Sequence, residues 1–245
     1  MLALKTKAIE IINLTKRYPN GRGINDLNLE VEQGEIFGFL GPNGAGKTTV
    51  MKVMTGLIKP DSGDVKLFGA SIQDDYVTAM QHVGCVIETA ESYPYLTAYE
   101  NLKMFARYYP HVDEKRIDHC LETVGLLKYK HEKPRKFSLG MKQRLGLACA
   151  ILSNPKLLIL DEPMNGLDVE GMLDMRHLIK RLAEEEGTTF FISSHLIHDV
   201  ERTCTQIGII YNGRLLSVKH MDQILANYAS LEHYFVSEVD RNGRI

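Results

Sequence analysis

The sequence has no apolar run of the about 18 residues that a membrane-spanning helix requires. Its first residues, MLALKTKAIE, lack the apolar stretch of a secretory signal peptide. Cysteines are few and form no CxxC pair, which is typical of reduced thiols inside a cell and not of a disulfide framework or zinc site. They are Cys85, Cys120, Cys149 and Cys204. These absences predict a soluble chain without a membrane segment of its own.

An excess of charge of one sign is also missing. The chain carries 29 Lys and Arg against 31 Asp and Glu, for a net charge of −2 at pH 7. Because a nucleic-acid-binding surface is normally basic, this balance argues against a nucleic-acid partner. No internal repeat or low-complexity segment is visible. With 245 residues, 44% of them apolar, the chain can bury a full core in one large domain or two closely joined subdomains.

What the sequence does contain is a complete phosphate-binding motif. Residues 41–49 read GPNGAGKTT, and residues 41–48 fit the pattern GxxxxGK[ST]. The glycines let the backbone bend so that successive N–H groups point at phosphate oxygens. An apolar, strand-like run at 35–40 precedes the motif, and apolar residues at helical spacing follow it over 50–57. The alternative, a glycine-rich turn that binds nothing, does not explain the full motif at a strand-to-helix junction.

The side chains of this motif predict individual contacts. Lys47 is placed to reach the β- and γ-phosphates, and the Thr48 hydroxyl to occupy one Mg²⁺ position, while the helix that follows adds the positive end of its dipole. No NKxD-like run is present to read guanine, so the sequence does not support a GTPase. The candidate nucleotide-binding residues of the loop are Gly41, Pro42, Asn43, Gly44, Ala45, Gly46, Lys47, Thr48 and Thr49.

A second, acidic motif follows the apolar run at 157–160. That run suits a buried parallel strand, which delivers Asp161 and Glu162 at its carboxyl end, where such sheets bind ligands. Asp161 can hold Mg²⁺ directly or through water, and Glu162 can accept a proton from the water that attacks the γ-phosphate. Taken alone, Asp-Glu-Pro fits a plain strand cap equally well. The phosphate-binding loop in the same chain favours the catalytic interpretation.

One histidine stands out among the nine in the chain. His195 follows a strand-like run at 188–192 and the pair Ser193 and Ser194, so we expect it at another strand end. There its ring can bond the γ-phosphate and orient the water or Glu162. The other histidines are interpreted as surface or packing residues, and His82, His111 and His119 show no metal-ligand pattern with the cysteines.

The order and spacing of these motifs resemble the nucleotide-binding subunits of ABC transporters over about residues 18–216. The resemblance implies an α/β fold, with a RecA-like P-loop NTPase core, an antiparallel β edge and an inserted helical subdomain at about 89–152. It implies a nucleotide-binding domain at 1–216. It also implies ATP and Mg²⁺ as cofactors. The residues at 217–245 are predicted from their own pattern to form a C-terminal helix, with a helix-like run at 221–226, and then a tail in which Leu231, Tyr234 and Phe235 could anchor to the domain.

The family signature, usually LSGGQ, is represented here by FSLGM at 137–141. Ser138 and Gly140 match, while Leu139 and Met141 depart from the pattern, so phosphate contacts are expected to depend on Ser138 and backbone N–H groups. In the family the helix that begins here points at the γ-phosphate bound to the opposite subunit, which implies a head-to-tail homodimer bridged by ATP. Ser138 also fits a plain helix N-cap, and both roles can hold.

Three further positions match family roles. Tyr18 stands where an aromatic residue stacks on adenine, although an ordinary half-exposed tyrosine is the alternative. Glu88 stands where a glutamine normally links Mg²⁺ to the membrane partner; it still offers an oxygen to the metal but adds a negative charge. Asp168 matches the residue that bonds across the dimer interface, while a plain surface turn explains the preceding Asn-Gly equally well.

Glu88 together with SLGMKQRLGLA at 138–148 resembles the family branch for bacitracin resistance and lantibiotic self-immunity in Gram-positive bacteria. The resemblance implies an ATP-hydrolysing subunit on the cytoplasmic face of a bacterial membrane. It would energise export of an antimicrobial peptide or antibiotic through a separate transmembrane permease. Export of a lipid, ion or drug is the alternative. A soluble non-transport ABC ATPase is disfavoured, because neither a second cassette nor a long coiled-coil insertion is present.

The segment between Glu88 and the signature is expected to be helical. A capping box at 97–100 predicts a helix that stops near Pro110, and a second helix is predicted over 113–124, ended by Gly125. Tyrosines concentrated here suit a groove for a short helix of the permease, as in the family, and core packing explains them equally well. They are Tyr93, Tyr95, Tyr99, Tyr108 and Tyr109.

Overall fold

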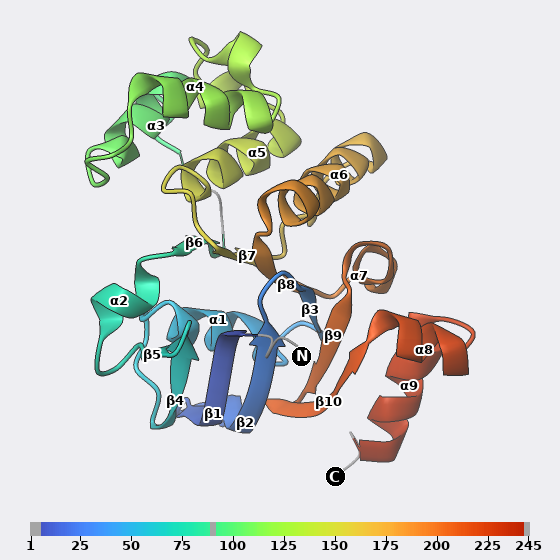
Figure 1. The fold of residues 1–245 in the computed structure, drawn as a ribbon. Helices are drawn as coiled ribbons and strands as arrows, with labels where there is room; N and C mark the ends of the chain where they lie inside the picture. The colour runs from blue at the N-terminus through green and yellow to red at the C-terminus, as the bar shows by residue number, and fades with distance from the viewer. Residues whose placement is uncertain (1–5, 89–91, 243–245) are drawn as a thin grey trace, which may run out of the picture.

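The computed structural model describes residues 6–88 and 92–242, and a mostly parallel sheet lies at its centre (Figure 1). The strand order is β10-β9-β3-β8-β7-β6, with β10 the antiparallel edge strand and the others parallel. Strands β3, β7 and β8 are buried along their whole length, as expected of strands covered on both faces. The bounds are β3 Ile36–Leu40, β6 Val83–Val86, β7 Leu157–Asp161, β8 Thr189–Ser194, β9 Gln206–Tyr211 and β10 Arg214–His220.

A second, antiparallel sheet has the strand order β2-β1-β4-β5. Burial alternates along β2, so one of its faces packs inward. Helix α1 lies between the two sheets, and its Val50, Met51 and Val53 share a core with apolar residues from strands of both. The predicted P-loop core with an antiparallel β edge is confirmed. The bounds are β1 Lys7–Arg17, β2 Gly23–Glu32, α1 Lys47–Met54, β4 Ser62–Leu67, β5 Ala70–Ser71 and α2 Tyr76–Met80.

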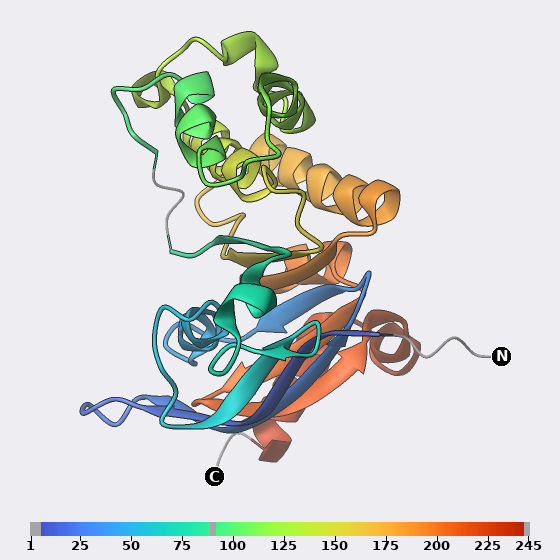
Figure 2. The same cartoon turned by 60° about the vertical axis from the view of Figure 1, so that its left-hand side comes forward.

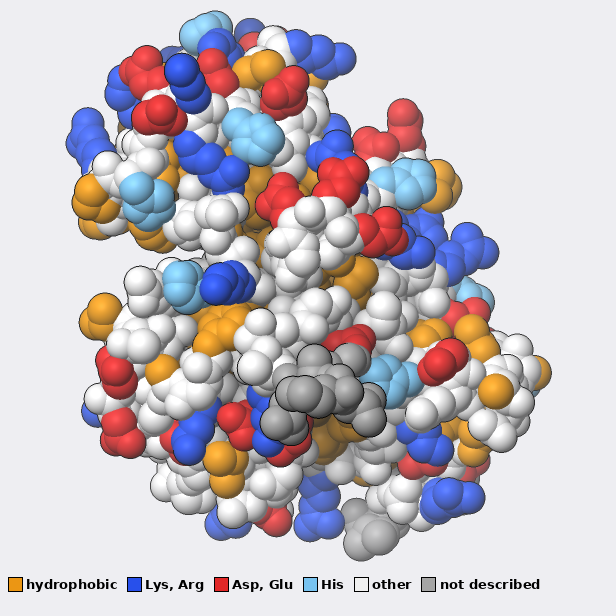
Figure 3. Space-filling view, viewed as in Figure 1, with side chains coloured by type: hydrophobic (Ala, Val, Ile, Leu, Met, Phe, Trp, Pro, Cys, Tyr) orange, Lys and Arg blue, Asp and Glu red, His pale blue; other side chains and the backbone are white. Residues whose placement is uncertain are grey.

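Helices α3, α4 and α5 form a separate group next to strands β6 and β7, and α6 lies beside them (Figures 1 and 2). Apolar residues that recur along these helices, among them Leu102, Leu121 and Leu145, are fully buried together. On the face shown in Figure 3, acidic and basic side chains are interspersed over this group. The bounds are α3 Ala98–Ala106, α4 Glu114–Thr123, α5 Leu139–Ala150 and α6 Val169–Glu186, with short 3₁₀ turns at Leu127–Tyr129 and Pro134–Lys136.

The capping box that opens α3 has the expected geometry. The Thr97 hydroxyl accepts from the Glu100 backbone N–H, and the Glu100 carboxylate accepts from the Thr97 N–H at 2.7 Å. The backbone hydrogen bond from Thr97 lowers the pKa of Glu100. Helix α3 ends at Ala106, earlier than the predicted stop near Pro110, because the backbone N–H groups of Tyr108 and Tyr109 close tighter turns. The expected start of the helical subdomain, at 89, lies outside the described residues.

The C-terminal part is more ordered than the sequence indicated. Strand β10 crosses the expected division after Leu216, because it pairs along its length with β9. Residues 231–242, expected as a tail anchored by apolar side chains, instead form helix α9, in which two of the expected anchors, Leu231 and Tyr234, are fully buried. Within the described residues, no helix combines the length and apolar character needed to cross a bilayer. The bounds are α7 Ile197–Thr203, α8 Met221–Asn227 and α9 Leu231–Asn242.

Candidate functional site

The phosphate-binding motif forms the loop between β3 and α1. Gly44 and Gly46 adopt φ of 81° and 110°, a left-handed region that residues with a side chain rarely enter. Gly41 is required for a different reason, since a Cβ there would lie 2.3 Å from the carbonyl oxygen of Ile210 on β9. The Gly41 N–H also donates to the Ser194 carbonyl at the end of β8. The loop is therefore held between β8 and β9, the two strands that flank β3.

Lys47 and Thr48 begin α1 and contact residues from the end of β7. The Lys47 side chain is only 6% exposed; its Nζ donates to the Gly41 carbonyl at 2.7 Å and lies 3.2 Å from Glu162 Oε1. The Thr48 hydroxyl donates to Asp161 Oδ2 at 2.9 Å. Residues more than a hundred positions apart are thereby brought into one site.

The ends of β7 and β8 hold the acidic residues. Strands β7 and β8 pair in parallel with Asp161 opposite Ser193. The buried Ser193 hydroxyl donates to Asp161 Oδ1 at 2.5 Å and accepts from the Glu162 N–H at 2.9 Å. Sequence reasoning treated Ser193 only as a lead-in to His195; its signal is its place at the end of the strand beside Asp161. One hydroxyl thus anchors both acidic residues.

Glu162 lies between a lysine and a histidine. Its Oε1 faces Lys47, and its Oε2 is 2.8 Å from Nδ1 of His195. The His195 backbone N–H donates to the same Oε2 at 3.3 Å. Glu162 has φ of 49°, an uncommon conformation for a residue with a side chain. The arrangement presents a carboxylate, held in one orientation, to the loop that would bear phosphates, and such a carboxylate can accept a proton from water.

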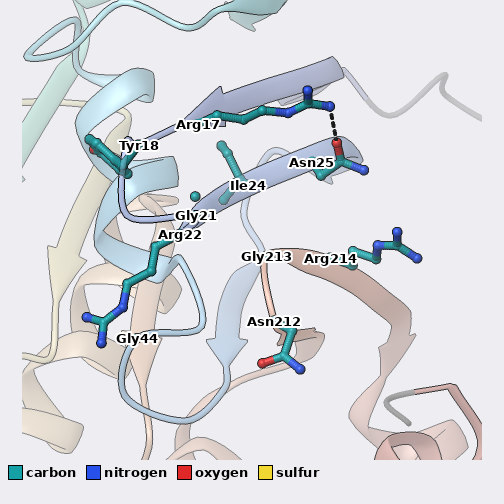
Figure 4. A pocket seen from close by; sticks show the side chains of 11 residues that line it. Arg17, Tyr18, Gly21, Arg22, Ile24, Asn25, Gly44, Asn212, Gly213 and Arg214 are labelled. Carbon is teal, nitrogen blue, oxygen red and sulfur yellow. Dashed lines mark hydrogen bonds between the residues drawn. The ribbon is translucent and has the colours of Figure 1, made fainter. Parts of the chain in front are cut away.

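Two adjoining hollows border the loop. One, of about 430 Å³, is lined by Tyr18, Asn20, Arg22, Gly23, Asn43, Gly44, Gly46, Lys47, Thr48, Thr49 and Glu162. The other, of about 700 Å³, shares Tyr18 and Gly44 and extends to the β9–β10 turn (Figure 4). In Figure 4, Tyr18 and Arg214 lie on opposite sides of this second hollow. Sequence reasoning missed Arg22, Asn212 in the β9–β10 turn and Arg214 at the start of β10, which belong to no motif.

Other predicted site residues line neither hollow. Ser138 caps α5 by accepting from the Met141 N–H at 3.2 Å, and Gly140 lies in the first turn of that helix. Asp168 caps α6 in the same way, accepting from the Gly171 N–H at 2.8 Å. Glu88 forms an ion pair with Lys52 of α1, with 2.5 Å between Nζ and Oε1. Within one chain, Ser138, Gly140 and Asp168 do not line the hollows beside the loop, whereas Glu88 contacts the helix that follows the loop.

The donor atoms beside Lys47 fit a magnesium ion. Mg²⁺ prefers oxygen ligands and is usually bound by one or two protein side chains together with phosphates and water. The Thr48 hydroxyl and the Asp161 carboxylate are two such donors in direct contact. Across the described part of the chain, no group of three or more His, Cys, Asp or Glu side chains is arranged to hold a metal. The site therefore suits a metal that arrives with phosphates.

The fold and this loop define a P-loop ATPase. The chain belongs to the ABC transporter family, whose model matches residues 24–165. It is similar to the bacitracin transport ATP-binding protein BcrA of Enterococcus faecalis, with 43% identity over 230 residues, 94% of this chain and 75% of that protein. It is also similar to the lantibiotic transport ATP-binding protein SrtF of Streptococcus pyogenes, with 39% identity over 216 residues, 87% of this chain and 91% of that protein.

A solved structure supports the same assignment. The dimeric, post-hydrolysis structure of the ATP-binding cassette MJ0796, bound to ADP and Pi, matches with a TM-score of 0.77 and 27% identity. The match covers 87% of this chain and 98% of that one. The predicted ABC ATPase fold is confirmed, and the chain is an ATP-binding and ATP-hydrolysing subunit. The resemblance to the bacitracin and lantibiotic branch is confirmed as well.

Proposed function

We propose that this chain hydrolyses ATP to energise the export of an antimicrobial peptide or antibiotic through a separate membrane permease. The names of BcrA and SrtF support the class of substrate, because they refer to bacitracin and lantibiotic transport. The observation that carries the enzymatic part is the contact set around Glu162, which joins the phosphate-binding loop to the ends of β7 and β8. The chain acts at the cytoplasmic face of the membrane, held there by the permease.

In this proposal Lys47 and the backbone N–H groups of residues 41–49 bind the β- and γ-phosphates. Thr48 and Asp161 hold Mg²⁺, which neutralises charge on the phosphates when bound. Glu162 is the general base for the attacking water, and its contact with His195 keeps the carboxylate directed at that water. Tyr18 lines both hollows beside the loop, as an adenine-stacking residue would.

The proposed active form is a head-to-tail homodimer. Ser138 and Gly140 are supplied to the ATP of the opposite copy, since they line neither hollow of their own chain. The exposed N-terminus of α5 leaves backbone N–H groups for a phosphate of that copy. Asp168 is proposed to lie at the same interface. The dimeric state of the MJ0796 cassette supports this arrangement.

We also propose a domain division. The nucleotide-binding domain, with its helical subdomain at about 89–152, extends through β10 to His220, because that strand completes the central sheet. The C-terminal unit is then the helix pair α8 and α9. Its buried Leu231 and Tyr234 attach it to the domain.

Replacing Glu162 with glutamine tests the enzymatic assignment. Glu162→Gln keeps the size of the side chain and removes its basicity, so ATP binding should persist while phosphate release falls by about 10²- to 10⁴-fold. The matched control is Glu185→Gln, which removes an exposed carboxylate on α6. Rapid turnover by the Glu162→Gln chain would remove Glu162 from the role of general base.

The same variant tests the transport assignment. Tagged Glu162→Gln chain is recovered with ATP and Mg²⁺ from gently solubilised membranes of its host. A co-purifying protein with several membrane spans supports the transporter. Recovery of the chain alone, or with ribosomal or DNA-bound material, favours the non-transport alternative. The sensitivity of the host to bacitracin and to a lantibiotic is then measured with and without the chain. Loss of the chain should increase sensitivity to one of them, and unchanged sensitivity to both contradicts the proposed substrate class.

A further inference from the structure

An ion pair joins Glu88 to Lys52 beside the proposed metal ligands. The Lys52 Nζ lies 2.5 Å from Glu88 Oε1. Lys52 is four residues after Thr48 on α1, and residues at this spacing lie on the same face of a helix. Glu88 follows strand β6, which pairs in parallel with β7, the strand that ends at Asp161. The ion pair therefore borders the same helix face and the same sheet edge as the proposed magnesium position.

The orientation of Glu88 is specific. Its φ of 66° lies in the left-handed region, which residues with a side chain adopt only where their surroundings favour it. The Lys52 side chain is 29% exposed and that of Glu88 is 61% exposed, so the lysine is the more enclosed of the two. The contact with α1 thus fixes one oxygen of a carboxylate that is otherwise largely exposed to solvent.

The negative charge of Glu88 acts on both ATP and the metal that accompanies it. A carboxylate near ATP repels its phosphates, whereas it attracts the divalent cation that accompanies them. Lys52 offsets the repulsion and also engages the oxygen that a cation would bind. A neutral amide at this position would need no such partner, so the role of Lys52 depends on position 88 being a glutamate.

We propose that Lys52 is a positioning residue that competes with Mg²⁺ for Glu88 and thereby sets the metal affinity of the ATP site. This inference rests on the proposed function, since it requires the site to bind ATP with Mg²⁺. Weakening the ion pair frees Glu88 for the metal, which tightens Mg²⁺ binding. In the absence of metal, the same change leaves the carboxylate uncompensated and weakens ATP binding.

The test measures binding without turnover, so every chain also carries Glu162→Gln. ATP binding by the full chain is followed by equilibrium dialysis, first with EDTA and then over a series of Mg²⁺ concentrations. Lys52→Gln should lower the Mg²⁺ midpoint and weaken ATP binding in EDTA, each by about two- to fivefold, as expected for a partly exposed ion pair. Lys52→Arg, which keeps the charge, should restore both values. Lys59→Gln, at an exposed lysine after the same helix, is the control for simple loss of one positive charge.

A second background separates the proposed role from a direct effect of the lysine. Because Lys52 acts through Glu88, Lys52→Gln should change the Mg²⁺ midpoint much less when the chain also carries Glu88→Gln. Equal changes in the two backgrounds, or no change in either, overturn the inference. The chain that carries Glu162→Gln alone serves as the reference. If this reference chain fails to bind ATP with Mg²⁺, the proposed function itself is wrong. Thermal unfolding of each variant checks that the folded state is retained.

Discussion

Removing the Ser193 hydroxyl should impair both acidic residues of the site at once. Ser193 is fully buried, and its Oγ lies 2.5 Å from Asp161 Oδ1 and 2.9 Å from the Glu162 nitrogen. Ser193→Ala deletes one atom and creates almost no cavity, so its effect comes from the two lost hydrogen bonds. The Glu162 N–H then has no partner from β8, although Glu162 must keep its left-handed backbone.

The magnitude follows from the character of these bonds. A hydrogen bond to a charged group contributes about 1.5–3 kcal/mol, and a buried N–H left unpaired costs about 1–3 kcal/mol. Because both hydrogen bonds share one hydroxyl, these contributions do not simply add, and we expect the free energy of unfolding to fall by about 2–4 kcal/mol. About half of this loss should raise the activation free energy of hydrolysis, because Asp161 and Glu162 are then less well positioned in the transition state. Since each factor of ten in rate corresponds to about 1.4 kcal/mol, kcat should fall by about 5- to 30-fold.

The assay combines urea unfolding with phosphate release at saturating ATP and Mg²⁺. The matched control is Ser194→Ala, because the neighbouring hydroxyl accepts from the nearby Leu196 N–H at 3.0 Å and not from a residue of the acidic motif. Ser194→Ala should lose less stability and keep most of its kcat. Wild-type kcat and stability in Ser193→Ala, or equal losses in the two variants, would refute the role we assign to Ser193.

Two further predictions concern the proposed adenine-stacking residue and one buried thiol. Tyr18→Ala should weaken ATP binding by about 5- to 100-fold, the range for loss of one stacked base. Tyr18→Phe keeps the ring and should bind ATP nearly as well as the unsubstituted chain. Equal weakening of ATP binding in both variants contradicts stacking. Burial raises the pKa of Cys204 from 9.0 to about 12, so this thiol should not react with a disulfide reagent at pH 8 until the chain unfolds. Because the folded pKa lies above the unfolded value, the contribution to stability is present below pH 9 and is lost as the pH rises from 9 toward 12. Urea midpoints at pH 8 and pH 10 measure this loss, which should be smaller in Cys204→Ala; an equal loss in that variant rejects the contribution of Cys204.

Local sequence patterns predicted the elements that depend on neighbouring residues. The loop at 41–48 could be identified because its conformation depends on glycines within it. The capping box at 97–100 is also local, since both of its hydrogen bonds join residues three apart. The strand at 157–160 was visible as an apolar run, which is typical of a strand buried on both faces.

Helix ends and the C-terminus were harder to predict because packing decides them. Residues 231–242 show no motif and were expected as a tail, yet they form α9. Two contacts stabilise this helix: the Tyr234 ring lies 5.0 Å from the Tyr228 ring, and the Glu201 carboxylate accepts from the Leu231 N–H at 2.7 Å. Glu201 belongs to α7, so the partner that favours the helix lies thirty residues earlier in the chain.

The sequence by itself determined the class of this protein, because the residues of each motif are consecutive and their chemistry can be recognised before their positions are known. Only the tertiary structure decided which motifs meet. The pairing of β7 with β8 places Ser193 opposite Asp161, and the packing of α1 against the sheet brings Lys47 to Glu162 and Lys52 to Glu88. Apolar periodicity indicates that a strand is buried but does not identify its neighbour. Which strand becomes its neighbour is decided when distant segments bury their apolar faces against one another. This packing brings the motifs into contact.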